Sequence, residues 1–186
     1  MARTRRIVTG HDSRGRSIFV KDGPCPYVFR RAGGNSLTEL WWTDRIPASN
    51  RGNRDCGAPK FGLDLPRAGT ICRIVDYPPD KVRKAAIDRA AARGEGQSRH
   101  YIKGSRHFGH HRTRTLDYAI VLEGEIYALM DEGARKMRAG DVLIQRGTAH
   151  AWSNRTDKNC KVAFILIDAT PLKRPKPAAR KRARRS

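Results

Sequence analysis

The sequence has little that would mark a secreted, membrane or disulfide-bonded protein. Its four cysteines, Cys25, Cys56, Cys72 and Cys160, are far apart and form no CxxC pair. This spacing is unlike the dense framework of small secreted domains and predicts reduced thiols. No apolar run approaches the ~18 residues of a membrane span, and the N-terminus MARTRRIVTG lacks the apolar stretch of a secretory signal. We therefore expect a cytoplasmic protein without a membrane partner.

Acidic residues are also scarce. The chain has 18 Asp and Glu against 39 Lys and Arg, a net charge of +21; eight of the basic residues lie in 171–186, and subtracting them leaves +13 for the rest. Such a charge attracts nucleic acid whether or not the protein was selected to bind it. We predict that the basic tail, residues 170–186, is disordered. It is a solvated tail, a nonspecific nucleic-acid attachment or, in a eukaryotic host, a nuclear address. Without helix-turn-helix or zinc-finger spacing we expect no specific nucleic-acid partner.

What is present is a series of short strands separated by turns. With 186 residues the chain is long enough for one well-packed domain. Before residue 110 we expect a pair of arm strands within 5–20, strands over 36–43 and 70–77, and a loop over 44–68. Asp80 is expected to cap a short helix over 81–93, with an apolar stripe of Val82, Ala86 and Ile87 and a stop at Gly94.

After residue 110 the strands follow at closer spacing. They are expected over 116–122, 125–130, 136–137, 141–144, 150–154 and 162–168. Short strands with glycine turns and one helix predict an all-β protein, a closed or sandwich-like antiparallel barrel. We divide the chain into N-terminal arm strands packing on the barrel (1–43), an insertion of loop, strand and helix (44–109), the barrel core (110–169) and the tail (170–186).

Two polar strand faces suggest a site. Side chains two residues apart share a face of a strand, so one face carries His111, Thr113, Thr115 and Asp117, and another carries His150, Trp152 and Asn154. If both faces converge on one interior, they form a pocket with acid and base groups. Structural readings of these residues stay open, because Trp152 could pack in the core, Asp117 could bond a backbone amide and His150 could be a hydrogen-bonded wall residue.

The same residues resemble the two motifs of the cupin superfamily. The first motif appears as His111, Thr113, Asp117 and Gly124, and the second as Gly140, Gly147, His150 and Asn154. The phrases VTGHD, LTELW, HRTRTLDY, AGDVLIQRGTAHAW and FILIDA also resemble a group of single-domain bacterial cupins. The resemblance implies a single cupin barrel, that is, a double-stranded β-helix or jelly roll.

The resemblance also implies a metal site, with two departures. Thr113 stands where a typical cupin has its second histidine, and Asp117 stands where glutamate is usual. The ligand candidates are therefore His111, Asp117 and His150, a set of two histidines and one carboxylate that suits Fe²⁺, with Mn²⁺, Ni²⁺ or Zn²⁺ as alternatives. No organic cofactor is expected. Without metal, a neutral histidine and a carboxylate could still move a proton.

We therefore predict a small-molecule enzyme with His111, Asp117 and His150 as catalytic residues and Thr113, Thr115, Trp152 and Asn154 as the substrate pocket. The candidate reactions are dioxygenation, decarboxylation and dehydration or isomerisation of a small organic acid or phenolic metabolite. The alternative is a cupin pocket that binds or senses a ligand without turnover. The apolar outer face of the strand after Asp117, with Tyr118, Ile120 and Leu122, predicts cover by the arm or by a second copy in a homodimer.

Overall fold

The part of the protein that the structure describes is an all-β barrel with one helix, as the sequence predicts. The computed structural model describes residues 3–57, 67–95, 101–102 and 104–171, so nearly all of the predicted tail lies outside the described residues. The strands are β1 (Arg5–His11), β2 (Ser17–Pro24), β3 (Val28–Arg30), β4 (Ser36–Thr43), β5 (Thr70–Tyr77), β6 (Thr115–Glu123), β7 (Glu125–Met130), β8 (Ala134–Arg138), β9 (Val142–Arg146), β10 (His150–Ser153) and β11 (Cys160–Asp168), and the helix is α1 (Asp80–Ala92).

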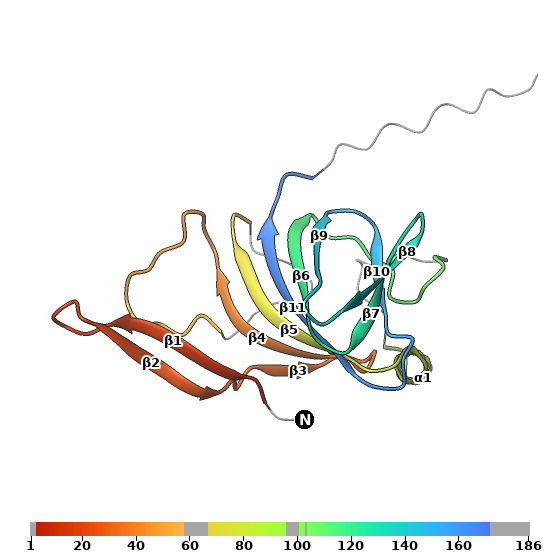
Figure 1. The fold of residues 1–186 in the computed structure, drawn as a ribbon, viewed down its shortest axis with the longest axis horizontal. Helices are drawn as coiled ribbons and strands as arrows, with labels where there is room; N and C mark the ends of the chain where they lie inside the picture. The colour runs from red at the N-terminus through yellow and green to blue at the C-terminus, as the bar shows by residue number, and fades with distance from the viewer. Residues whose placement is uncertain (1–2, 58–66, 96–100, 103, 172–186) are drawn as a thin grey trace, which may run out of the picture.

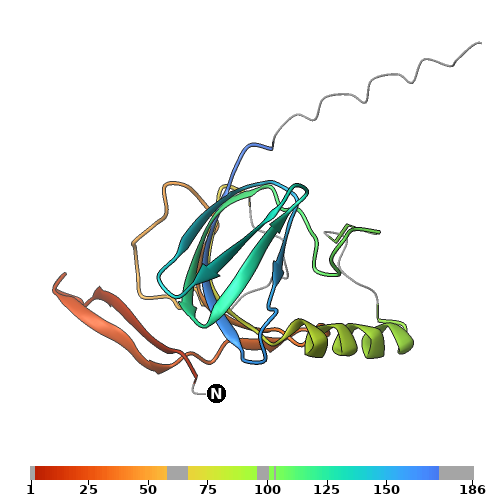
Figure 2. The same ribbon diagram turned by 45° about the vertical axis from the view of Figure 1, so that its right-hand side comes forward.

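The strands form three antiparallel sheets. The largest has the order β3-β4-β5-β11-β6-β9, a smaller one has the order β10-β7-β8, and β1 and β2 form a two-stranded sheet. The two larger sheets form the barrel, and the β1–β2 hairpin projects from it (Figures 1 and 2). Residues 28–43, which the sequence assigned to an arm packing on the barrel, are instead strands of the main sheet, because β4 pairs along its length with β5.

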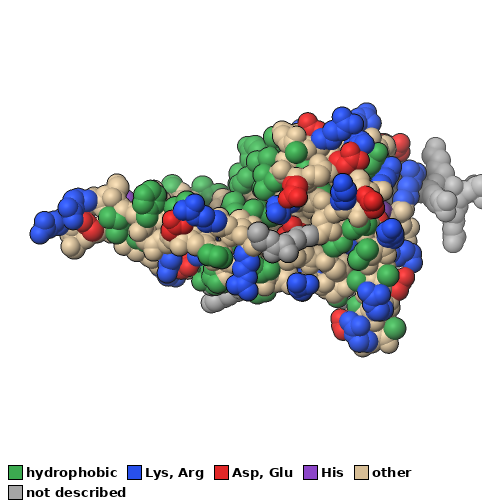
Figure 3. Space-filling view, turned by 60° about the horizontal axis from the view of Figure 1, so that its bottom comes forward, with side chains coloured by type: hydrophobic (Ala, Val, Ile, Leu, Met, Phe, Trp, Pro, Cys, Tyr) green, Lys and Arg blue, Asp and Glu red, His purple; other side chains and the backbone are tan. Residues whose placement is uncertain are grey.

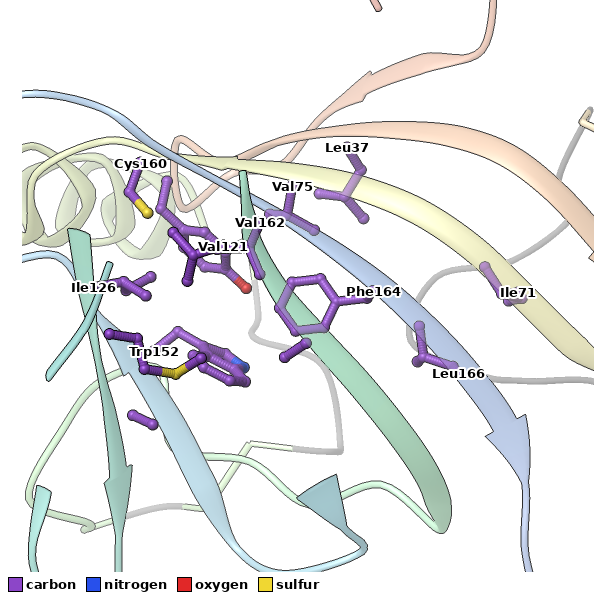
Figure 4. Packing of buried hydrophobic residues seen from close by; sticks show 14 residues of the cluster. Leu37, Ile71, Val75, Val121, Ile126, Trp152, Cys160, Val162, Phe164 and Leu166 are labelled. Carbon is purple, nitrogen blue, oxygen red and sulfur yellow. The ribbon is translucent and has the colours of Figure 1, made fainter. Parts of the chain in front are cut away.

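The hydrophobic core lies between the two larger sheets. Trp152 of β10 and Phe164 of β11 meet edge to face with ring centroids 5.3 Å apart, and Tyr77 packs against Phe164 at 6.4 Å. Figure 4 shows Trp152 and Phe164 among aliphatic side chains from both sheets, including Val121, Ile126 and Val162. This apolar core holds the strands that carry the polar residues described below.

Strand β4 contains a bulge that reverses the alternation expected from its sequence. Glu39 is opposite Arg73 in β5 and Trp41 is opposite Cys72, so Leu40 is the extra residue. A slip of one residue moves every later side chain to the other face. Trp42 therefore packs against the core, on the face that carries Glu39, whereas regular alternation would group Glu39 with Trp41.

Helix α1 begins and ends where the sequence predicts but buries a different face. The expected stripe is only partly buried: Ala86 and Ile87 are half-buried, but Val82 is 45% exposed while Arg83 is 5% exposed. The Arg83 guanidinium lies over the rings of Tyr77 and Phe108 and donates to the carbonyl of Trp152 at 2.8 Å. A cation stacked on aromatic rings with a carbonyl partner replaces the apolar contact that helical periodicity favours. Asp80 does not cap the helix through its side chain; it accepts hydrogen bonds from Ser153 and from the backbone of Asn154.

Two expectations from composition can also be compared with the structure. All four cysteines are free, as their spacing predicts. No helix in the described part of the chain is long and apolar enough to cross a membrane.

Candidate functional site

Two histidines form the centre of the candidate site. His111 and His150 lie opposite each other and exchange backbone hydrogen bonds of 2.8 and 2.9 Å. Their rings are 4.3 Å apart between centroids. The main chain thus brings together two residues 39 positions apart in the sequence, as the two convergent polar faces predict.

Backbone carbonyls determine the tautomer of both rings. Nδ1 of His111 lies 2.8 Å from the carbonyl oxygen of Gly109, and Nδ1 of His150 lies 3.0 Å from that of Thr148. A carbonyl oxygen can only accept, so each Nδ1 carries the hydrogen and donates. In the neutral ring Nε2 then has an unprotonated lone pair, which can accept a proton or bind a metal.

The two histidines differ in accessibility. His150 is 2% exposed, and burial lowers its pKa to about 3, with the neighbouring His111 adding to the effect. His150 is therefore neutral at physiological pH. His111 is only half-buried and contacts the ring of Tyr101 at 5.8 Å, so it is the member of the pair that solvent or a substrate reaches first.

A polar track continues from His111 into the barrel through Thr113, Thr115 and Asp117, all three of which are buried. The hydroxyls of Thr113 and Thr115 are hydrogen-bonded to each other at 2.8 Å. Burial raises the pKa of Asp117 to about 6, although the Thr115 hydroxyl and the Arg73 charge lower it. This carboxyl therefore gains and loses a proton within one unit of neutral pH.

Gln145 is part of this interior site, and sequence reasoning missed it. Gln145 of β9 lies directly opposite Asp117 of β6, and its Oε1 accepts hydrogen bonds from the backbone and hydroxyl of Thr148. Its Nε2 and the Oδ1 of Asp117 are both buried without a hydrogen-bond partner among the described residues. One donor and one acceptor thus remain unsatisfied on neighbouring strands. The alternation in VLIQR, with Leu143 and Gln145 on one face, could have revealed this.

A buried ion pair is the second element that sequence reasoning missed. Arg73 of β5 and Glu39 of β4 are 3% exposed each, and two contacts of 3.0 and 3.2 Å join them. Arg73 lies in register with Phe164, which places the pair on the inner face of the main sheet. Glu39 within the apolar stretch LTELWW was the available signal, but its partner is 34 residues away in the sequence.

The three predicted metal ligands do not come together. Among the residues that the structure describes, no group of three His, Cys, Asp or Glu side chains could hold a metal ion. Nε2 of His111 and of His150 is a suitable donor atom type, but Asp117 does not complete the set. The arrangement therefore does not fit a three-ligand centre, and we derive no step through a metal.

Two predicted pocket residues have structural contacts. Asn154 is fully buried, and its amide bonds the backbone of Tyr77 and Lys158 and the hydroxyl of Thr156, so it fixes the β10–β11 turn. Trp152 contacts the ring of His150 at 5.8 Å but belongs to the hydrophobic core. A ligand contact by either side chain stays a prediction.

The fold and site define a class of protein, an antiparallel barrel that carries histidines at the start of β10 and ahead of β6. A cupin domain model matches residues 99–167. The chain is 42% identical over 173 residues to the cupin-domain-containing oxidoreductase srdD of Neurospora crassa, covering 88% of this chain and 74% of that protein. It is 39% identical over 170 residues to the oryzines biosynthesis cluster protein J of Aspergillus oryzae, covering 90% and 84%. The chain belongs to the cupin superfamily.

The relatives found here are fungal proteins, so they do not support the bacterial group that the sequence phrases suggested. Among solved structures, a putative ethanolamine utilization protein of Salmonella typhimurium matches with a TM-score of 0.46 and 12% identity, covering 91% of this chain and 100% of that one.

Proposed function

We propose that this cupin is an enzyme that transfers a proton to or from a small organic molecule, an organic acid or a phenolic compound, at His111. The observation that carries the proposal is a pair of histidine rings 4.3 Å apart whose Nδ1 atoms donate to backbone carbonyls, so that proton exchange takes place at Nε2. His111 is the accessible base, because its partner is buried. His150 stays neutral and so adds no positive charge beside it.

Asp117 supplies the second ionisable group. With a pKa of about 6 it can store a proton near neutral pH, and Gln145 beside it offers an N–H donor. Removal of a proton is a step common to dehydration and isomerisation. The relatives named oxidoreductases support an enzyme in this family.

The test is turnover by the full chain on a panel of hydroxy acids, phenols and hydroxybenzaldehydes, followed by mass spectrometry. We expect a product with the wild type, its loss in His111→Gln and His150→Gln, and retention in the matched control His11→Gln on the hairpin. Product formation that is unchanged in both barrel variants would overturn the proposal. Elemental analysis of protein purified without a chelating tag measures divalent metal independently, with His150→Ala as its control.

A ligand-binding or sensing module is the second candidate. The unsatisfied Asp117 and Gln145 atoms favour it, because a ligand with one donor and one acceptor would complete them without any reaction. Thermal stabilisation by a compound of the panel that is not converted, lost in Gln145→Leu, would favour binding over catalysis.

We further propose a cytoplasmic homodimer. The outer face of β6 and β9 exposes Tyr118, Leu122, Val142 and Ile144, each between 39% and 55%. Such a face on neighbouring strands is more apolar than a monomer usually exposes, and a second copy would cover it. Analytical ultracentrifugation of the wild type and Val142→Lys tests this, and a monomeric wild type contradicts it.

For the basic tail we propose nonspecific nucleic-acid attachment, tested by truncation after Thr170 and a salt titration.

A further inference from the structure

A cavity lies outside the barrel interior, beside the β1–β2 hairpin. It has a volume of about 670 Å³ and is bordered by the hairpin, the end of β4 and the loop of residues 44–56. This loop leaves β4 and arches over toward the hairpin (Figure 1). The space-filling view shows the hairpin projecting from the body, with hydrophobic side chains gathered where the two meet (Figure 3). A volume of this size accommodates a small organic ligand.

Two anchors hold the cavity open in a defined shape. At the base of the hairpin, Arg6 is 8% exposed and makes two contacts of 2.7 and 2.9 Å with Asp55 of the loop. At the far end, the Asn53 amide bonds both the backbone N–H and the carbonyl of His11, in the manner of a neighbouring strand. Because residues 53–55 of the loop are tied to both ends of β1 and the loop continues from β4 at its other end, the cavity is preformed and is more than a gap between segments.

The lining combines aromatic surface with positive charge. Trp41 and Trp42 both border the cavity, and Val8 and Val20 of the hairpin add apolar surface. The loop contributes Arg45, Arg51 and Arg54 against a single acid, Asp44. Among the described residues, Arg51 and Arg54 make no ion pair, so their guanidinium groups are available to a ligand.

We propose that this cavity is a binding site for a small planar aromatic anion, such as an aryl carboxylate. The indole of Trp41, on the outer face of β4, takes the ring, and Arg51 and Arg54 take the carboxylate, for which the guanidinium fork is suited. The site is separate from the histidine pair and does not depend on the function proposed for it.

Isothermal titration calorimetry with 2-naphthoate on the full chain tests the proposal, with uncharged 2-naphthalenemethanol as comparison. The double variant Arg51→Gln/Arg54→Gln should weaken naphthoate binding about tenfold or more, the loss of a charge-assisted contact, and change the neutral compound's affinity little. The double variant Arg14→Gln/Arg89→Gln removes the same charge at exposed sites outside the cavity and should bind naphthoate like the wild type.

A third variant tests the cavity's shape without changing its charge. A Cβ on Gly10 would collide with the Asn53 side chain and with Val20. Gly10→Ala should therefore release the loop from His11 and weaken the binding of both compounds. The proposal is overturned if naphthoate does not bind, if the Arg51/Arg54 variant binds it as the wild type does, or if His111→Gln abolishes binding, since the ligand would then occupy the barrel interior.

Discussion

The barrel interior and the cavity beside the hairpin use polar side chains in different ways. In the interior, Asp117 and His150 are almost completely buried, and removal from water shifts the pKa of each toward its neutral form. Beside the hairpin, the arginines lie on a loop in contact with solvent, and their charges persist at every physiological pH. We infer that burial suits the interior groups to proton transfer, whereas the charged loop suits the cavity to binding an anion. The two can be altered separately.

The largest expected effect comes from breaking the buried ion pair in the interior. Arg73→Met leaves Glu39 as a buried charge without this partner, and removal of one member of such a pair costs about 3–5 kcal/mol. Urea unfolding should show this loss. The double variant Glu39→Leu/Arg73→Met should recover most of it, because no unpaired charge remains, and a double variant as unstable as the single one would contradict the explanation.

The next effect is a change in the pH dependence of stability. Because the folded pKa of Asp117 is raised from 3.8 to about 6, its contribution is fully present below about pH 4 and is lost as the pH rises through 6. The free energy of unfolding of Asp117→Asn should therefore rise by about 2–3 kcal/mol relative to that of the wild type when the pH is raised from 4 to 7. Equal differences at both pH values, measured by urea unfolding, would show that the carboxyl titrates normally.

The contribution of His150 to the pH dependence of stability has the opposite sign in the same experiment. Its folded pKa is lowered to about 3, so its contribution is present above about 6.5 and is lost as the pH falls toward 3. The contribution of His150 to the free energy of unfolding is the same in the wild type and in Asp117→Asn, so it cancels when the two unfolding free energies are subtracted. The pair of measurements therefore isolates the carboxyl.

A smaller effect is expected at the anchor of the outer cavity. Asp55→Asn removes the charge that faces the buried Arg6 and should cost about 1–2 kcal/mol. It should also speed proteolysis within residues 44–57 while leaving the pH dependence of the barrel unchanged. Cleavage at the wild-type rate would mean that other contacts hold the loop.

The smallest effect is expected on the exposed side of the same hairpin. Arg5 and Asp22 form an ion pair of 2.7 Å with both side chains well exposed. Exposed pairs contribute little to stability, so Arg5→Met should unfold at the wild-type urea concentration. A clear loss would remove the contrast between buried and exposed pairs on which the first prediction depends.

Most strands could be predicted because glycine and proline mark their ends; the strand over 70–77 was predicted with the bounds it has. The histidine pair was also accessible, since alternation and motif spacing both indicate it. The Glu39–Arg73 pair was not, because nothing local links residues on different strands. The prediction of which α1 side chains are buried missed Arg83 for a related reason. Aromatic rings from β5 and from the segment before His110 bury Arg83, and those contacts do not appear in helical periodicity.

The bulge at Leu40 has a consequence for comparing this chain with its relatives. A bulge is one residue that the strand could gain or lose while its partner strand stays the same. Deleting Leu40 would leave Trp41 opposite Cys72 and Trp42 opposite Ile71, so the pairing would become regular and neither indole would change face. Alignments of cupins in this region should therefore allow a single-residue gap, and a relative that lacks the extra residue would show uninterrupted alternation along this strand with the same side chains facing the core.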